Sequence, residues 1–303
     1  MSAEFVSLDI PEEIAGRWSI STASLIADTE SSIVHRATLA DGSSAILKRL
    51  KPRGLGELPG MTFLKWRNGQ GAARLLQGSG TACLLEDAGD LTLRAHRLHY
   101  GEEAANVVIV SVLQTLHGSG RAEVVGLTPL ERHFRSLLSR AETETDEQLR
   151  EPLGYCAEIA RQLLANQKDI KPLHGDLHHD NIVSGGNRGW LAIDPQGLLG
   201  DPAYDVANIF GNPLNALPDI IDPYRITTLC TIFADTLNCT REKILRYAIA
   251  HAGLSVCWSL EDGGALDDSV NARERLAFLT VARDLLPNFS ARPLQQRLQD
   301  ILR

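Results

Sequence analysis

Three oxygen-bearing side chains, Asp176, Asn181 and Asp194, lie at the ends of two short apolar runs in this chain of 303 residues. The runs, 182–183 and 190–193, are joined by a segment of glycine and asparagine that tolerates the positive φ of a hairpin turn. A hairpin folds the second run back on the first, so Asp194 returns toward Asp176 and Asn181. Carboxylate and amide oxygens suit a hard cation, and the pattern therefore predicts a site for Mg²⁺.

The same stretch also permits two other interpretations. Histidine and aspartate side chains could ligate zinc in a metal hydrolase, or they could simply solvate a loop. Five potential ligands within seven residues cannot all point inward from one loop, and no second cluster of His or Cys elsewhere in the sequence completes a zinc site. These five residues are His174, Asp176, His178, His179 and Asp180.

The spacing His174-x-Asp176-x-x-x-x-Asn181, followed by Ile193-Asp194, resembles the catalytic and metal loops of protein-kinase-like enzymes. The resemblance implies that Asp176 is the base that accepts the proton of the acceptor hydroxyl. It makes Asn181 and Asp194 ligands of Mg²⁺, and His174 a brace for the loop.

The continuation Gly200-Asp201-Pro202-x-x-Asp205 narrows the resemblance to aminoglycoside phosphotransferases, in which the acid at Asp205 ties the following helix to the catalytic loop. With further motifs, the chain is similar to the aminoglycoside/hydroxyurea antibiotic resistance kinase family from about residue 18 to residue 285. The best-known members of this family are streptomycin 6-phosphotransferases. The motifs lie at 66–76, 173–179, 193–198 and 257–263.

This resemblance implies an enzyme that transfers the γ-phosphoryl group of ATP, with Mg²⁺, to a hydroxyl of a small cationic aminoglycoside such as streptomycin. Two alternatives stay open from the sequence. One is a kinase of another small hydroxylated metabolite, and the other is a nucleotide-binding protein that has lost turnover.

The implied fold class is α+β, with a small antiparallel N-lobe at 1–86 that binds nucleotide and a mainly helical C-lobe at 87–303. The C-lobe would carry the hinge, the catalytic and metal loops and the acceptor site. The residue pattern agrees, because short β-type runs and a turn at Asp41-Gly42 come first. A helix broken at Asn68-Gly69 follows, and helical spacing then covers 102–116, 127–141, 152–164 and most of the chain beyond 200.

Lys48 ends the apolar run 45–47, where the resemblance places the phosphate-binding lysine. Strand alternation puts Ile46 and Lys48 on one face. The acid that pairs with this lysine is open. Glu57 is the first acid to follow, but Pro59-Gly60 come directly after it and are unfavourable inside a helix. Either Glu57 lies at a helix start or Lys48 is paired differently.

The loop at 28–32, expected to cover the nucleotide phosphates, contains no glycine. The hydroxyls of Ser31 and Ser32, with backbone N–H groups, would therefore form the phosphate cradle. By the same analogy, Glu86 and Ala88 in the hinge would offer backbone groups to the adenine edge.

A net charge of −8 disfavours nucleic acid and anionic membranes as partners and suits a cationic acceptor. Three carboxylates outside the catalytic set, Asp201, Glu261 and Asp262, are candidates for contact with that acceptor. Scattered cysteines, the lack of a signal-peptide pattern and the lack of an apolar run of membrane-spanning length predict a soluble cytoplasmic protein without a membrane partner. The sequence does not distinguish a monomer from a homodimer.

Overall fold

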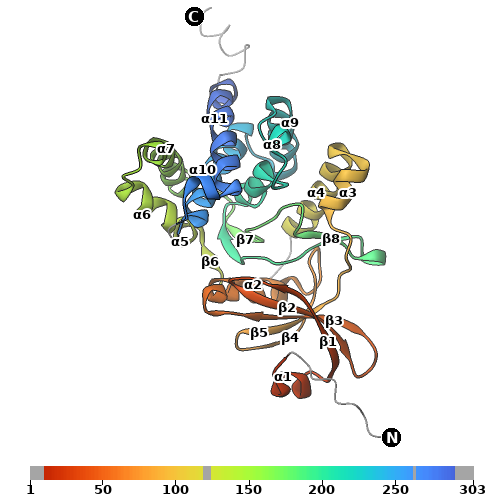
Figure 1. The fold of residues 1–303 in the computed structure, drawn as a ribbon. Coiled ribbons are helices and arrows are strands. Elements are labelled where there is room, and N and C mark those ends of the chain that lie inside the picture. Colours follow the sequence, from red (N-terminus) through yellow and green to blue (C-terminus); the bar gives the residue numbers. More distant parts are fainter. Residues whose placement is uncertain (1–9, 119–123, 262–263, 291–303) are drawn as a thin grey trace, which may run out of the picture. The chain divides into compact units, whose positions relative to one another are not determined.

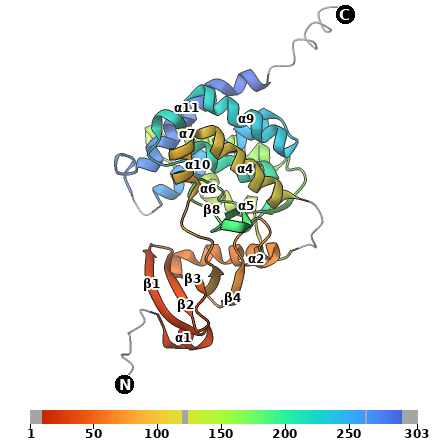
Figure 2. The same ribbon diagram turned by 90° about the vertical axis from the view of Figure 1, so that its right-hand side faces the viewer.

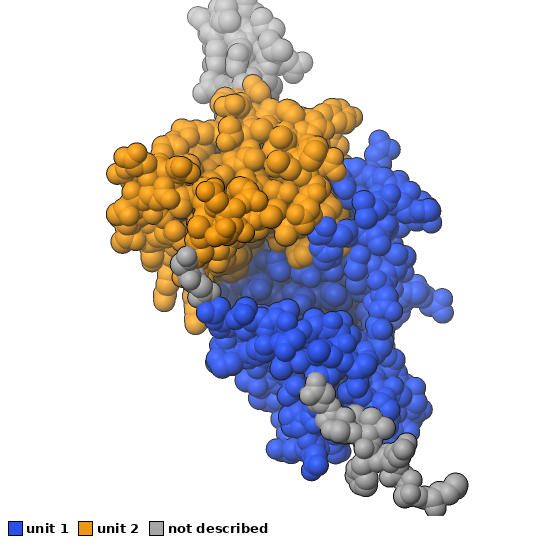
Figure 3. Space-filling model, in the orientation of Figure 1, with its two compact units in different colours: residues 1–128, 172–176, 180–199 blue, residues 129–171, 177–179, 200–303 orange. Residues whose placement is uncertain are grey.

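The structure, a computed structural model, describes residues 10–118, 124–261 and 264–290. The chain forms two compact units, each assembled from separate segments of the sequence (Figure 3). Unit 1 contains residues 1–128, 172–176 and 180–199, and unit 2 contains residues 129–171, 177–179 and 200–303. The division into lobes at 1–86 and 87–303 follows a different criterion and stays a prediction.

Unit 1 is built on a five-stranded antiparallel sheet with the order β1-β2-β3-β5-β4 (Figure 1). The predicted turn at Asp41-Gly42 joins β2 to β3. Gly42 has a φ of 84°, and the N–H of Ser43 donates to Asp41 Oδ1 at 2.9 Å. The strands are β1 (Ile20–Asp28), β2 (Ser32–Leu39), β3 (Ser44–Leu50), β4 (Leu75–Ser79) and β5 (Ala82–Glu86).

The central strand β3 has two different faces, as its alternation predicts. Ala45 and Leu47 are fully buried in an apolar core that includes Trp18. Ile46 and Lys48 line a cavity on the opposite face. One side of the strand therefore stabilises the sheet, and the other side is available to a ligand.

The remaining elements of unit 1 are helices and one hairpin. The hairpin predicted between Asn181 and Asp194 is confirmed, because β8 and β9 pair antiparallel. The break predicted at Asn68-Gly69 is also confirmed, since α2 ends at Asn68 with a left-handed φ of 47°. These elements are α1 (Glu12–Arg17), η1 (Pro52–Glu57), α2 (Leu58–Arg67), α3 (Leu93–Tyr100), α4 (Glu102–His117), β8 (Ile182–Ser184), η2 (Gly186–Arg188) and β9 (Trp190–Ala192).

Unit 2 is mainly helical and is organised around α10 (Arg241–Ser259), which packs against α7, α9, α11 and η3 (Figure 2). Buried aromatic rings fill the space between these helices, among them Phe134, Tyr204, Tyr247 and Phe278. The other elements are α5 (Leu130–His133), α6 (Arg135–Thr143), α7 (Glu147–Leu164), η3 (Pro202–Gly211), α8 (Leu217–Ile220), α9 (Pro223–Leu237), η4 (Leu266–Asp268) and α11 (Val270–Ser290).

A three-stranded sheet, ordered β6-β10-β7, contains positions at which the chain passes from one unit to the other. Its strands are β6 (Thr128–Pro129), β7 (Lys171–Leu173) and β10 (Leu198–Gly200). Within the described residues, no helix is both long and apolar enough to cross a membrane.

Most predicted helices are present, but their boundaries differ. The single helix expected at 127–141 is wrong, because Phe134 has a non-helical φ and ψ and separates α5 from α6. The helix expected to begin at residue 152 begins one turn earlier. Asp146 caps it by accepting the N–H of Gln148 at 2.8 Å.

The start of α2 lies unusually close to the segment that follows Asp194. A Cβ built on Gly60 would lie 1.9 Å from the backbone oxygen of Pro195, and one on Gly197 would lie 2.2 Å from that of Pro59. Only glycine permits such an approach of two backbones. Gly60, which is unfavourable inside a helix, is thus required by packing within unit 1.

We expect Gly60→Ala to lower the free energy of unfolding by on the order of 2–4 kcal/mol, because the new methyl group collides with backbone rather than with a movable side chain. Gly154→Ala in α7 is the matched control, since its Cβ would meet nothing within 4 Å. That change should raise stability by about 0.5–1 kcal/mol, as expected for alanine replacing glycine inside a helix. Urea unfolding of both variants measures the difference, and equal effects would contradict the close approach.

Candidate functional site

The catalytic loop predicted at His174 begins directly after β7 and is held by a buried imidazole. His174 is 0% exposed, and its Nε2 lies 2.8 Å from the carbonyl oxygen of Ile193. Its Nδ1 accepts the N–H of Asp176 at 3.3 Å. Because a carbonyl can only accept, Nε2 carries the proton and the ring is neutral. His174 therefore joins the loop to the end of β9.

Asp176 and Asn181 lie side by side within this loop. The Asn181 amide nitrogen donates to the Asp176 backbone oxygen at 2.9 Å and to Asp176 Oδ2 at 3.2 Å. These bonds direct the amide nitrogen of Asn181 at the carboxylate and leave its oxygen as the end suited to a cation. The N–H of Ile193 also donates to the Asn181 backbone oxygen at 2.9 Å, which places Asp194 next to a residue bound to Asn181.

Lys48 lies between two carboxylates. Its Nζ is 2.7 Å from Glu57 Oε2 and 2.5 Å from Asp194 Oδ1, and its side chain is 11% exposed. Burial alone would favour the neutral amine, but Asp194 and Glu57 outweigh burial and raise the pKa of Lys48 above its ordinary value. Glu57 occupies the N-cap position of α2. The question left open by the sequence is thereby answered, since Glu57 both starts the helix and pairs with the lysine.

A cavity of about 290 Å³ opens beside Lys48, and all of its lining residues belong to unit 1. Its walls are aliphatic, and its rim carries several acids together with Lys48 and Arg36. A narrow aliphatic space with a polar rim suits a flat heteroaromatic ring. The aliphatic lining includes Val34, Ile46, Ala73, Leu85, Val183 and Ile193, and the acids are Glu86, Asp87, Asp90, Asp180 and Asp194.

The hinge residues predicted to face adenine differ in their bonding. Glu86 already uses its backbone N–H, which donates to Arg74 at 2.9 Å, and its carboxylate binds Arg188. Ala88 lines the cavity and is 8% exposed, and the described part of the chain offers its N–H no hydrogen-bond partner. Ala88 is thus the hinge residue with a backbone donor available to a ligand.

Ser31 lies in the turn between β1 and β2, and Ser32 is the first residue of β2. The N–H of Ser32 donates to Thr29 Oγ1 at 3.0 Å, and the carbonyl of Ser31 accepts the N–H of Lys51 at 2.8 Å. Of the described residues of β1 and β2, the cavity is lined by Ile26, Val34 and Arg36. A phosphate-binding role for the two serines stays a prediction.

Two arginines that form ion pairs at the cavity were missed by the sequence reasoning. Arg94, in the first turn of α3, binds Asp180 through two bonds of 2.6 Å each. Arg36 of β2 binds Asp87 at 3.0 Å and also pairs with Asp90. Sequence spacing carries no signal for such long-range pairs. They fasten the catalytic loop and the hinge to neighbouring elements of unit 1.

The zinc interpretation finds no support in this geometry. Two of the five proposed ligands, His174 and Asp180, are engaged with Ile193 and Arg94. Across the ranges that the structure describes, no group of three or more His, Cys, Asp or Glu side chains is placed to hold a metal ion.

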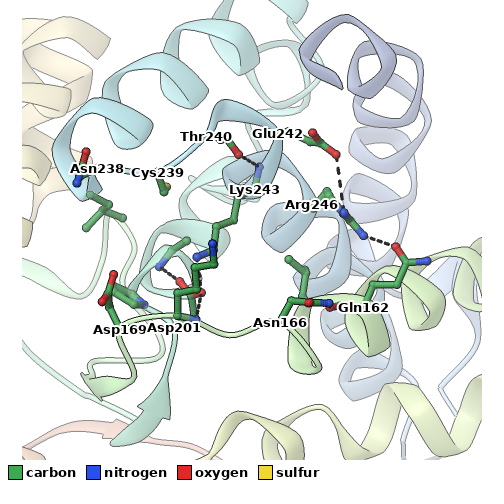
Figure 4. Close-up of a pocket in the computed structure, with 15 residues that line it drawn as sticks. Gln162, Asn166, Asp169, Asp201, Asn238, Cys239, Thr240, Glu242, Lys243 and Arg246 are labelled. Atoms are coloured by element: carbon green, nitrogen blue, oxygen red, sulfur yellow. Dashed lines mark hydrogen bonds and ion pairs between the residues drawn. The ribbon is translucent and has the colours of Figure 1, made fainter. Parts of the chain in front are cut away.

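In unit 2, Asp201 is buried and has several protein partners. It caps η3 by accepting the N–H of Ala203 at 3.1 Å, accepts the N–H of Lys168 at 3.0 Å and pairs with Lys243. Figure 4 shows Lys243 reaching Asp201 from α10, at the side of a cavity of about 730 Å³ within unit 2. The carboxylate therefore has a structural role, and its contact with an acceptor stays a prediction.

The other predicted residues of unit 2 are placed as follows. Asp205 is 1% exposed within η3, and its tie to the catalytic loop stays a prediction. Glu261 is exposed just beyond α10. Asp262 lies outside the described residues.

A cluster of rings near the end of α10 was not predicted. The Tyr204 hydroxyl lies 2.6 Å from His133 Nε2 and 2.9 Å from His251 Nδ1. Both imidazoles also pack edge-on against Trp258. Burial lowers the pKa of His133 to about 4. The pKa of His251 is lowered by burial first, and then by Arg275, His133 and His178.

Comparison with known proteins gives a consistent result. The sequence model of the family described as aminoglycoside/hydroxyurea antibiotic resistance kinase matches residues 17–263. Streptomycin 3''-kinase of Klebsiella pneumoniae is 38% identical over 72% of this chain and 84% of that protein. Streptomycin 6-kinase of Streptomyces griseus is 26% identical over 82% of this chain and 81% of that protein.

Among solved structures, an aminoglycoside phosphotransferase in a ternary complex with ADP and hygromycin B superimposes with a TM-score of 0.62. The match covers 90% of this chain and 98% of that one, at 12% identity. At this identity the match concerns the fold alone, and it confirms the predicted protein-kinase-like α+β class.

We expect acid to destabilise the protein through His133 and His251. The unfolded chain protonates an imidazole near pH 6.5, whereas the folded state keeps His133 neutral down to about pH 4. Between these values the unfolded state binds more protons, so the free energy of unfolding falls as the pH drops. The loss between pH 7 and pH 5 should be on the order of 1–3 kcal/mol.

Urea unfolding at several pH values measures this slope. His133→Gln removes one titrating group and should flatten the slope between pH 6.5 and pH 5. An unchanged slope would mean that the pKa of His133 is the same in the folded and unfolded states.

Proposed function

Because this chain belongs to the aminoglycoside/hydroxyurea antibiotic resistance kinase family and is a phosphotransferase, we propose that it phosphorylates a hydroxyl of a cationic aminoglycoside, using ATP. Streptomycin is the first acceptor to test, since it appears in the names of both relatives. Those names specify different positions, 3'' and 6, so the phosphorylated hydroxyl has to be read from the product.

The observation that carries this proposal is the charged centre around Lys48. A lysine held between Glu57 and Asp194, next to an aliphatic cavity, is the arrangement that an enzyme needs to bind nucleotide phosphates beside an adenine pocket. Ala88 would contact the adenine edge through its unpaired N–H. Ser31 and Ser32 remain candidates for the phosphate loop.

The oxygen atoms near the catalytic loop fit Mg²⁺ by their chemistry. Asn181 would hold the ion through its amide oxygen, and Asp194 through its carboxylate, which is 49% exposed. Both are hard ligands of the kind Mg²⁺ prefers. When bound, the ion would neutralise charge on the phosphate oxygens.

Asp176 would act as the base, and its bond with Asn181 supports this role. Asn181 holds one of its carboxylate oxygens and orients the group. Asp176 would accept the hydroxyl proton as the phosphoryl group is transferred. His174 positions the loop through its two ring nitrogens, and Asp205 would support it from η3.

Acidic groups would compensate the charge of the acceptor. Glu261 is the first candidate because it is exposed, and Asp262 follows it in sequence. Asp201 is a weaker candidate, since its carboxylate is already bonded to Lys243 and to two backbone N–H groups.

The direct test is ADP release with ATP, Mg²⁺ and streptomycin, followed by mass spectrometry of the product.

We expect Asp176→Asn to reduce turnover by on the order of 10²–10⁴, because an amide cannot accept the proton. Nucleotide affinity should change little, since Lys48, Asn181 and Asp194 are intact. Near-normal turnover of the variant would remove Asp176 from the role of base, and no phosphorylation by the wild type of any cationic aminoglycoside would overturn the proposed function.

The metal assignment gives a separate expectation. Asp194→Ala removes a charged ligand and one partner of Lys48, so both the affinity for Mg-ATP and turnover should fall, by on the order of 10² or more. Asn181→Ala removes a neutral oxygen and should be milder. Titration with Mg²⁺ at fixed ATP measures the order of the two effects. The reverse order, with Asn181→Ala the more severe, would contradict the assignment.

A further inference from the structure

Trp258 in the last turn of α10 combines exposure with rigidity. It is 39% exposed, although tryptophan is mostly buried in folded proteins, as Trp18 is at 6%. His133 packs against its ring at 5.2 Å between centroids and 72° between planes, and His251 does so at 6.0 Å and 78°. Two packing contacts thus hold the indole ring, while part of it stays accessible to solvent.

The support behind Trp258 is a chain of three hydrogen-bonded groups. The Tyr204 hydroxyl joins His133 to His251, and both Tyr204 and His251 are 2% exposed. A hydroxyl can donate to one imidazole and accept the N–H of the other, so two neutral rings satisfy the whole chain. The lowered pKa values of both histidines agree with this neutral state.

The cluster shares unit 2 with one residue of the predicted catalytic loop, His178, and with an exposed acid. His178 contributes to the lowered pKa of His251, after burial, Arg275 and His133. The acid is Glu261, whose N–H donates to the carbonyl of Trp258 at 3.4 Å just beyond the end of α10. The exposed indole is therefore followed directly in the chain by a carboxylate that is accessible to a cation.

From these contacts we propose that Trp258, supported by His133, Tyr204 and His251, forms a neutral aromatic platform that binds an amine or guanidine of the acceptor. The platform rests on the proposed function for the identity of that acceptor. The indole face attracts cations more strongly than any other aromatic side chain. Within the described residues, no Arg or Lys of the chain stacks on Trp258, whereas Arg283 stacks on Tyr155 and Arg67 on Trp66.

The neutrality of the imidazoles matters for this role. A protonated His133 at 5.2 Å from the indole would occupy the same quadrupole and repel an arriving cation. Burial keeps the ring neutral at physiological pH. The charged groups near the cluster are then two arginines and two acids. Arg275 acts on His251, and the Nη1 of Arg140 donates to the carbonyl of Leu260 at 3.3 Å. Glu144 and Glu261 carry the opposite charge near Cys257, next to Trp258.

The test compares Trp258→Ala with Trp258→Phe, and uses Trp190→Phe on β9 as the matched control. Streptomycin binding is measured by calorimetry, and the KM values for streptomycin and ATP are measured by ADP release. Loss of the ring should weaken streptomycin binding by roughly 3–30-fold and leave the KM for ATP unchanged. Phenylalanine should recover most of the affinity, and Trp190→Phe should have no effect. Thermal unfolding checks that Trp258→Ala is folded. If it is not folded, the comparison of Trp258→Phe with the wild type still measures the effect of the indole ring.

The outcomes separate this platform from the proposed function. Turnover of streptomycin by the wild type with an unchanged streptomycin affinity in Trp258→Ala would overturn the platform and leave the function standing. Trp258-dependent binding of streptomycin without phosphorylation would support the platform and contradict the function. No binding of streptomycin by the wild type would overturn the platform as well.

Discussion

The ammonium group of Lys48 joins three segments that are far apart in the sequence. It comes from the sheet, while Glu57 comes from the start of α2 and Asp194 from the end of the β8–β9 hairpin. A buried lysine without partners would lose its proton, and two carboxylates without the lysine would repel each other. Each charge is therefore stabilised only when all three segments are in place. The backbone contact of Gly60 with Pro195 brings two of these segments together, so packing and electrostatics depend on the same arrangement.

The arrangement of the predicted catalytic loop could be anticipated from the sequence, because it depends on residues that are close together in the chain. A hairpin separates Asn181 from Asp194, and the glycines in its turn are visible in the sequence. The hairpin brings its two ends together, and Asp176 lies only five residues before Asn181. Lys48 could be placed for a similar reason, since alternation along β3 fixes which face it shares with Ile46. Where a short stretch of backbone determines how close two residues lie, their spacing in the sequence is sufficient to predict that they are neighbours.

Relations between distant segments could not be predicted in this way. Glu57 stayed open because local propensity argues against a helix that contains Pro59-Gly60, and only the approach of Pro195 explains why glycine is present. The pair of Arg94 with Asp180 joins residues 86 positions apart, and no periodicity marks it. The same limit applies to the proposed acceptor site. Acids in the sequence suggested a role there, but the ring cluster around Trp258 depends on how the three helical segments α5, η3 and α10 pack.

The pairing of Lys48 with two acids also bears on how one carboxylate could serve two cations. Asp194 is the proposed ligand for a metal ion, and in this structure it is also a partner of Lys48. If Asp194 were the sole partner, engaging a metal ion would leave a buried ammonium group unpaired, which is unfavourable. Glu57 reduces this conflict, because it lies 2.7 Å from the same nitrogen and remains a partner of Lys48. Under the proposed assignment, Glu57 would therefore allow Asp194 to bind the metal ion without leaving Lys48 unpaired.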